Sequence, residues 1–241
     1  MHFDTAILCE AGGRGYNEDC CGHQEHGGNS VWVLADGLGG HGSGDIAAQT
    51  AVEAVLAHFQ TRPEVSTENL LACLVSGHEA VLGKQNGNAS PRQMYTTAVV
   101  LLASTHSACW GHAGDSRLYF FHGGRIAKRT LDHSVPQTLV SAGQLREREI
   151  RFHEDRNRLL RTLGSRQELK PSVDSHGALE AGDAFLLVSD GFWEYVFETE
   201  MEVELARAAS AASWIDGVKL RLRTRAMSDR DNCSAIAVFV E

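Results

Sequence analysis

The sequence predicts one compact domain of the α+β class, in which strands and helices occupy separate stretches of the chain. Short apolar runs rich in β-branched and aromatic residues indicate strands, and residues 31–35 are the clearest of them. Two successive segments with helical periodicity, residues 46–59 and 70–82, follow with no strand between them. Because strand and helix do not alternate one by one here, no parallel βαβ unit is expected.

The composition excludes several classes of protein. The chain has 241 residues, enough for one domain with a substantial core, and a formal net charge of −9. This acidic balance argues against a nucleic-acid-binding protein, whose affinity needs a basic surface. No apolar run reaches the roughly 18 residues of a membrane span, and the N-terminus lacks a signal-peptide pattern. The six cysteines include no C-x-x-C pair, which favours free thiols. We expect a cytoplasmic protein, and a monomer.

A glycine-rich stretch follows the clearest strand. The strand is expected to stop at Asp36, and the next helix is expected to be capped by Ser43 or Asp45. The backbone between them is rich in glycine, with Gly37, Gly39, Gly40, Gly42 and Gly44. A carboxylate at a strand end beside bare backbone is a place where a cation or a phosphate can come close.

A dinucleotide-binding loop is one alternative for the same stretch, because Gly37, Gly39 and Gly42 satisfy the pattern G-x-G-x-x-G. That pattern needs a second strand soon after the helix, ending in an acid roughly 20 residues beyond the glycines. Here a second helical segment comes instead, and the acid before the first glycine has no role in nucleotide binding. The alternative is therefore disfavoured.

The remaining elements follow from apolar runs and turn residues. Strands are expected at residues 3–9, 96–104, 106–113, 118–121, 172–176, 184–189 and 233–240, and helices at residues 137–142, 192–196, 198–212 and 215–227. The Gly123-Gly124 pair predicts a tight hairpin, so residues 96–127 are expected to form a β-meander. Residues 146–161 are densely charged, which is typical of a surface excursion.

Four aspartates occupy similar places in these elements. Asp36 and Asp190 each end a buried strand before a glycine, Asp115 lies in a Gly-Asp-Ser turn, and Asp231 precedes the last strand. Taken singly, each is an ordinary turn residue. If the strands share sheets, however, the four carboxylates can converge, and such a group suits hard cations such as Mg²⁺ or Mn²⁺. Carboxylates cannot stay charged and close together without cations.

Three residues near the N-terminus fit the same chemistry. Glu18 and Asp19 are neighbours in an extended segment, so their side chains point to opposite faces; one can ligate a cation while the other orients water. The Arg14 guanidinium can hold a phosphate through two N–H donors. Two cations about 3.5–4 Å apart that share a carboxylate and a hydroxide are the usual machinery for in-line attack on phosphorus.

These residues form motifs that resemble those of the metal-dependent protein phosphatases of type 2C, in that family's order and over nearly the whole chain. The motifs are Arg14-x-x-Asn-Glu18-Asp19, Ala35-Asp36-Gly37-Leu-Gly39-Gly40, Gly114-Asp115-Ser116-Arg117, Ser189-Asp190-Gly191 and Asp231-Asn232. The resemblance implies a four-layer α/β/β/α sandwich, with two antiparallel β-sheets flanked by helix pairs. Residues 1–241 would form a single catalytic domain, with a flap at roughly residues 132–168.

The resemblance also implies a function and a role for each residue. The protein would hydrolyse phosphoserine and phosphothreonine in proteins by attack of a hydroxide that bridges two Mn²⁺ or Mg²⁺ ions, and would oppose a bacterial Ser/Thr kinase. Asp36 would bridge the two ions; Asp190 and Asp231 would complete the first, and Glu18 and the Gly37 carbonyl the second. Asp19 would hold metal-bound waters, Asp115 would help to bind a weaker third ion, and Arg14 would grip the substrate phosphate.

The source of the leaving-group proton is open, because Leu38 stands where some family members carry a histidine. His41 is one alternative donor, and water on the third ion at Asp115 is the preferred one. Two alternatives to a protein phosphatase also stand. One is a non-catalytic phosphoprotein-binding or partner-switching module with the same fold, although such a module is expected to lack metal carboxylates. The other is a metal-dependent hydrolase of small phosphates.

Overall fold

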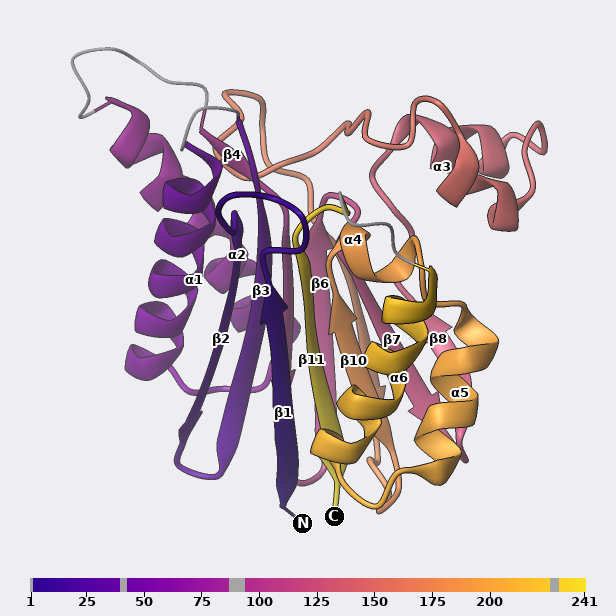
Figure 1. Cartoon of the computed structure of the whole chain (residues 1–241). Coiled ribbons are helices and arrows are strands. Elements are labelled where there is room, and N and C mark those ends of the chain that lie inside the picture. The colour runs from indigo at the N-terminus through magenta and orange to yellow at the C-terminus, as the bar shows by residue number, and fades with distance from the viewer. Residues whose placement is uncertain (1, 40–42, 87–93, 226–229) are drawn as a thin grey trace.

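Two antiparallel β-sheets pack face to face at the centre of the molecule (Figure 1). The computed structural model describes residues 2–39, 43–86, 94–225 and 230–241. One sheet has the order β1 (Phe3–Glu10), β11 (Cys233–Val240), β10 (Ala184–Val188), β7 (Arg117–His122) and β8 (Arg125–Arg129). The other has the order β2 (Asp19–His26), β3 (Asn29–Leu38), β5 (Ala98–Ala103), β6 (Ser107–Ala113) and β9 (Ser172–Gly177), and β4 (Tyr95–Thr96) pairs with β3.

Helices cover the outer face of each sheet. The pair α1 (Gly44–Thr61) and α2 (Thr67–Asn86) packs on the sheet that contains β3, and the pair α5 (Glu198–Arg207) and α6 (Ala211–Arg225) packs on the other (Figure 1). In α1 the buried residues Ala47, Ala51, Val55 and Phe59 recur every four positions, which places them on one face of the helix. The four-layer sandwich that the family resemblance implied is confirmed.

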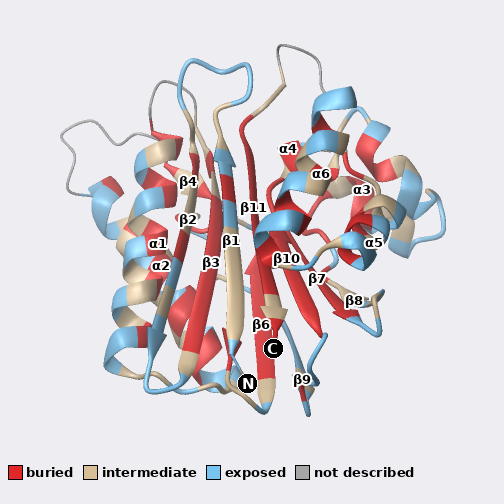
Figure 2. Cartoon of the chain, turned by 60° about the horizontal axis from the view of Figure 1, so that its bottom comes forward, coloured by how far each residue is buried: buried red, intermediate tan, exposed pale blue. Residues whose placement is uncertain are grey.

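The apolar side chains form a core at each of the three interfaces between the layers. Between the sheets, the ring centroid of Trp110 on β6 lies 5.9 Å from that of Phe120 on β7 and 6.0 Å from that of Phe185 on β10. Separate apolar clusters fill the spaces between each sheet and its helices. The central strands are accordingly buried along most of their length (Figure 2). Every described helix is too short or too polar to cross a lipid bilayer.

Three predictions about local structure are wrong. The strand that was expected to stop at Asp36 continues to Leu38, because Gly37 and Leu38 pair with β4. Residues 96–127 are not one meander: β5 and β6 lie in one sheet, β7 and β8 in the other, and the chain crosses over in the turn before β7. The break between the helices expected at 198–212 and 215–227 lies earlier than predicted: α5 ends at Arg207, and α6 begins at Ala211, whose N–H donates to the Asp4 carboxylate at 2.7 Å.

Two helix starts also differ from expectation. Ser43 precedes α1 but its side chain makes no capping hydrogen bond, whereas Asp45 lies within the first turn, where a carboxylate interacts favourably with the helix dipole. The short helix expected at 192–196 is α4 (Asp190–Trp193), which begins with Asp190 itself. The first turn of α4 therefore carries one of the predicted site residues.

The flap, residues 132–168, contains α3 (Val135–Ser141) and a 3₁₀ helix, η1 (Glu147–Phe152), and stands out from the sandwich beside the end where β4 and α4 lie (Figure 1). Two ion pairs attach it to the α4–α5 region: Arg156 to Glu194 at 2.6 Å, and Arg151 to Glu198 at 2.8 Å. The chain termini lie at the opposite end of the molecule (Figure 1).

Candidate metal centre

A polar cavity of about 160 Å³ lies where the strands of both sheets end beside the flap. Its walls come from the N-terminal loop, the ends of β3 and β10, the turn before β7, the flap and the start of β11. They are formed by Arg14, Glu18, Asp36, Gly37, Leu38, Gly39, Asp115, Asn157, Leu159, Asp190, Asp231 and Asn232. The structure therefore brings together every predicted site residue except Asp19.

Backbone hydrogen bonds hold Asp36 in place. The N–H of Asp36 donates to the Thr97 hydroxyl at 3.0 Å, and its carbonyl accepts the Thr97 N–H at 2.8 Å and the Thr96 hydroxyl at 2.9 Å. These two threonines lie where β4 gives way to β5, so the backbone of β3 is held from the neighbouring strands at Asp36.

The glycines after Asp36 and Asp190 allow the backbone to pack closely. A Cβ atom on Gly37 would collide with the carbonyl of Gly44 and would lie 2.8 Å from that of Glu18. A Cβ atom on Gly191 would collide with the carbonyl of Asn232. Only glycine lets the N-terminal loop, the start of α1 and the start of β11 meet at the two aspartates.

The turn that carries Asp115 is tied to Asp36 and to α4. The Ser116 hydroxyl lies 2.7 Å from the Thr97 hydroxyl, which also binds the Asp36 N–H. The indole Nε1 of Trp193 donates to the Asp115 carbonyl at 3.0 Å. Thr97, Ser116 and Trp193 thus position the two aspartates relative to each other.

Asp19 lies behind the cavity wall instead of lining it. The Ser189 hydroxyl donates to its carboxylate at 2.9 Å, and the Ser234 N–H donates to that same hydroxyl at 2.9 Å. Burial raises the pKa of Asp19 to about 7, with a further contribution from the charge of Asp190. The neighbouring Glu18 lines the cavity, so these side chains point in different directions, as their place in an extended segment predicts.

Asn232 organises the N-terminal loop. Its side-chain oxygen accepts the Glu18 N–H at 2.9 Å, and its amide donates to the carbonyls of Ala11 and Tyr16. The Arg14 guanidinium donates to the Asp231 carboxylate at 2.9 Å, although Arg14 itself is exposed. Arg14 thus reaches the cavity, and in this structure it is paired with a predicted metal ligand.

Burial and mutual repulsion raise the pKa values of the clustered carboxyl groups. The pKa of Asp36 is raised well above its ordinary value by burial and by the charges of Asp190, Asp19 and Asp115. Burial and Asp190 likewise raise the pKa of Asp115. Burial and Asp231 raise the pKa of Asp190, which shares a hydrogen bond with Asp36. The clustered carboxyl groups can therefore ionise together only when positive charge is placed among them.

The donor set fits divalent cations that prefer oxygen. One carboxylate oxygen of Glu18 and one of Asp19 are buried without a hydrogen-bond partner. Among the described residues, no three His, Cys, Asp or Glu side chains already form a metal-ligand cluster. The carboxylates instead line the walls of one cavity, and Asp231 is engaged by Arg14. Mn²⁺ or Mg²⁺ would supply the positive charge that this all-oxygen site needs.

Neither Leu38 nor His41 is placed by the structure as a donor of the leaving-group proton. Leu38 lines the cavity and brings no titratable group to it. His41 lies outside the described residues. His133, at the start of the flap, accepts the Gly114 N–H through Nδ1 at 3.3 Å and so supports the turn that carries Asp115.

Sequence reasoning missed the flap residues Asn157 and Leu159, which line the cavity. Both lie in the polar stretch of 146–161, where no periodicity distinguishes one residue from its neighbours. It also missed Ser189 as the partner of Asp19. The signal for Ser189 was present, because it directly precedes a strand-ending aspartate in the Ser-Asp-Gly motif.

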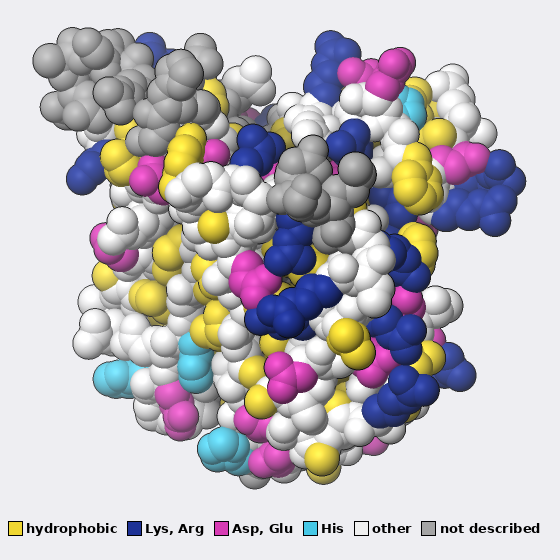
Figure 3. Space-filling view, viewed as in Figure 1, with side chains coloured by type: hydrophobic (Ala, Val, Ile, Leu, Met, Phe, Trp, Pro, Cys, Tyr) yellow, Lys and Arg dark blue, Asp and Glu magenta, His cyan; other side chains and the backbone are white. Residues whose placement is uncertain are grey.

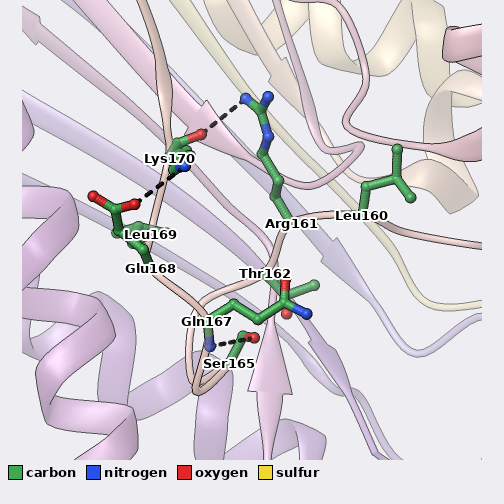
Figure 4. Close-up of a pocket in the computed structure, with 8 residues that line it drawn as sticks. All are labelled: Leu160, Arg161, Thr162, Ser165, Gln167, Glu168, Leu169 and Lys170. Atoms are coloured by element: carbon green, nitrogen blue, oxygen red, sulfur yellow. Dashed lines mark hydrogen bonds and ion pairs between the residues drawn. The ribbon is translucent and has the colours of Figure 1, made fainter.

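A separate cavity of about 190 Å³ lies along residues 160–170, between the flap and β9 (Figure 4). Its one carboxylate, Glu168, is paired with Lys170 at 3.1 Å, and Arg161 donates to the Lys170 carbonyl at 2.9 Å. With a single carboxylate that is already neutralised, this cavity is not a second candidate metal centre.

Comparison with known proteins shows which family the chain resembles. A family model described as protein phosphatase 2C matches residues 14–230. Protein phosphatase PhpP of Streptococcus pneumoniae is 30% identical over 203 residues, which cover 82% of each chain. The S. agalactiae serine/threonine phosphatase structure shares the fold, with a TM-score of 0.86 and 24% identity over 100% of both chains. The catalytic domain of the serine/threonine protein phosphatase PstP, solved in complex with two manganese ions, has a TM-score of 0.81 and 28% identity over 98% of this chain and 97% of that one.

The fold, the acidic cavity and these matches define a metal-dependent serine/threonine protein phosphatase. The chain belongs to the protein phosphatase 2C family, among its bacterial members.

Proposed function

We propose that the enzyme hydrolyses phosphoserine and phosphothreonine in proteins by direct attack of hydroxide on phosphorus, with no covalent enzyme intermediate. The P–O bond to the attacking hydroxide forms as the P–O bond to the serine or threonine oxygen breaks, and that oxygen takes up a proton. The observation that carries the proposal is the convergence of Glu18, Asp36, Asp115, Asp190 and Asp231 on one cavity with Arg14 at its edge.

Each residue has an assigned role in this reaction. Asp36, Asp190 and Asp231 would hold one core ion, and Asp36, Glu18 and the Gly37 carbonyl the other. When bound, the core ions supply an activated hydroxide and neutralise phosphoryl charge, and a weaker third ion at Asp115 supplies an acidic water. Arg14 would leave Asp231 and bind the substrate phosphate through its two N–H donors, since the exposed guanidinium already reaches the cavity.

The physiological substrate would be a protein phosphorylated by a cognate Ser/Thr kinase. A protein substrate is supported by the flap, which adds Asn157 and Leu159 to the cavity wall and extends the surface beside it. A partner-switching module without activity is the second candidate, but the full set of metal carboxylates present here favours catalysis.

A phosphatase assay tests the proposal. We expect the purified chain to release orthophosphate from phosphoserine and phosphothreonine peptides with Mn²⁺ or Mg²⁺, to lose this activity in excess chelator, and to regain it when Mn²⁺ is restored. Turnover that persists in chelator would contradict metal dependence. Binding of the phosphopeptide without turnover under any metal condition would instead support the non-catalytic module.

Asp115→Ala tests the source of the leaving-group proton. A serine alkoxide leaves poorly unless it is protonated, whereas p-nitrophenolate leaves readily without an acid. We expect the variant to lose roughly 10²-fold in kcat on phosphopeptides, the size of a general-acid contribution, and much less on p-nitrophenyl phosphate. Equal losses on the two substrates would show that Asp115 acts on a step common to both.

A further inference from the structure

A cavity of about 270 Å³ under the flap is lined entirely by charged side chains. They come from β7, β8, η1 and the start of α5, and none belongs to the candidate metal centre: Arg117, Arg129, Glu147, Arg148, Arg151 and Glu198. We call this space the arginine cavity. It belongs to the half of the molecule that carries α5, α6 and the flap, over which Lys and Arg side chains gather in Figure 3.

Positive charge is in excess in the arginine cavity. Three of its arginines have carboxylate partners: Arg117 with Asp132 at 2.7 Å, Arg129 with Glu147 at 2.8 Å, and Arg151 with Glu198 at 2.8 Å. The Arg148 side chain is exposed, and no ion pair or side-chain hydrogen bond joins it to the residues that the structure describes. The charge of Glu149 acts on it, but Glu149 is already paired with Arg146 at 2.7 Å. The arginine cavity therefore holds one guanidinium that has no carboxylate partner of its own.

The second observation is a buried donor without an acceptor. The Arg129 side chain is only 9% exposed, and its Nη2 is buried with no hydrogen-bond partner. Its other terminal nitrogen is held by Glu147, whose own side chain is 58% exposed. A buried charged donor without an acceptor is costly, so this geometry favours an additional anionic acceptor.

A purely structural network that attaches the flap explains only part of this arrangement. It accounts for Arg117 and Arg151, which pack on aromatic rings and have complete carboxylate partners. It does not account for the free Nη2 of Arg129 or for Arg148. The cavity is also slightly smaller than the 300–1,000 Å³ usual for organic ligands, and this favours a small ion.

We propose that the arginine cavity binds a phosphate-type oxyanion, held mainly by Arg129 and Arg148. Guanidinium groups suit this ligand because their planar N–H pairs match two oxygens of a tetrahedral anion. Glu147 is exposed enough to swing aside and leave both terminal nitrogens of Arg129 to the anion. The anion can be free orthophosphate, the product of the reaction, or a second phosphoryl group on a phosphoprotein substrate.

One residue, Trp193, contacts both the arginines of the arginine cavity and the turn that carries Asp115. The guanidinium carbon of Arg117 lies 3.5 Å from the centroid of the Trp193 ring, and Arg151 donates to the Trp193 carbonyl at 2.8 Å. The indole Nε1 of the same residue donates to the Asp115 carbonyl at 3.0 Å. Its N–H resonance therefore reports on events in the arginine cavity as well as at the metal centre.

Calorimetric titration of the Mg²⁺-loaded full chain with sulfate tests the proposal at low ionic strength. We expect the wild type to show one more saturable site than Arg148→Gln, or a site whose affinity falls about tenfold or more in that variant, as loss of a charged ligand predicts. The Trp193 indole N–H should shift on titration in the wild type and shift less in Arg148→Gln. Arg62→Gln, at the C-cap of α1 with a side chain that is 42% exposed, is the charge-matched control and should titrate as the wild type does.

Two outcomes overturn the proposal: no saturable sulfate site outside the metal centre, or equal sulfate binding in Arg148→Gln and the wild type. Arg148 is exposed, so its replacement is not expected to disturb folding; Arg129→Gln serves as the second variant where it folds. Kinetics separate the two sources of the anion. A KM raised in Arg148→Gln only for a doubly phosphorylated peptide supports a second phosphoryl group. Loss of sulfate binding with unchanged KM for both mono- and diphosphorylated peptides supports free orthophosphate.

Discussion

Asp36→Asn is expected to abolish phosphopeptide turnover while making the metal-free protein more stable. The carboxylate lies at the centre of the acidic cavity and is the proposed bridge between two cations, so its loss should lower kcat by at least roughly 10³-fold, or several kcal/mol of transition-state stabilisation. The stability gain has a separate cause. Burial and three neighbouring aspartates raise the pKa of Asp36, so the folded state holds its proton more tightly than the unfolded state does.

The sign of that effect follows from linkage. A carboxyl group with a raised pKa in the folded state costs stability as the pH rises from its ordinary value through the raised one, and the cost remains at higher pH. Asparagine has no proton to lose, so the variant avoids the cost. In excess chelator at neutral pH we expect its Tm to exceed that of the wild type by about 2–8 °C, equivalent to ~1–2 kcal/mol. With Mn²⁺ the order should reverse, because the wild type gains more from binding. A Tm in chelator at or below that of the wild type would contradict this account.

Asp132→Asn is expected to be the most destabilising single change near the site. Asp132 and Arg117 form an ion pair with two hydrogen bonds, at 2.7 and 2.8 Å, and their side chains are only 1% and 2% exposed. The substitution removes the carboxylate that pairs closely with a buried guanidinium and leaves only Glu198 at 3.7 Å, which is shared with Arg151. Loss of one partner of a buried pair typically costs about 3–5 kcal/mol. For a domain of this size that is a fall in Tm of roughly 6–20 °C, measured by calorimetry.

Two controls separate the buried charge from other effects. Arg125→Gln breaks the Arg125–Glu202 pair, in which the arginine side chain is 79% exposed, and should change stability by less than about 1 kcal/mol. The double variant Arg117→Met with Asp132→Leu removes both charges and should recover much of the loss. If Asp132→Asn is no worse than Arg125→Gln, the pair is not the determinant that its burial indicates.

The sequence predicts those features whose pattern lies within one short segment of the chain. Apolar runs and helical periodicity are local, so residues 31–35 and 184–189 were assigned to strands and residues 46–59 and 70–82 to helices. The acids were predictable as a group because Asp36 and Asp190 each stand at the end of an apolar run. Their convergence required knowledge of which strands are neighbours, and that came from the resemblance to a family.

Contacts between distant parts of the chain could not be predicted. Nothing local distinguishes Thr97 as the residue that clamps Asp36, or Asn232 as the one that holds the N-terminal loop. The crossing between sheets before β7 depends on which strands become neighbours, and β6 and β7 bury side chains on both faces, so the pattern of each strand does not reveal its sheet. Arg129 and Arg148 are likewise indistinguishable by sequence from other arginines. What sets them apart is the buried, unpartnered Nη2 of Arg129 and the place of Arg148 in the wall of the same cavity.

The pairing of the first strand with the last determines how the fold would respond to a pulling force. The N–H of His2 donates to the carbonyl of Glu241 at 2.8 Å, and β1 and β11 are antiparallel neighbours from Phe3 opposite Val240 to Glu10 opposite Cys233. A force applied at these two ends would therefore load the hydrogen-bonded pairs one after another, as in opening a zipper, and would not shear them all at once. The first hydrogen bonds to break would thus be those at the chain termini, which lie at the end of the molecule opposite the metal centre. Tension would reach the acidic cavity only after β1 had separated from β11 along its whole length.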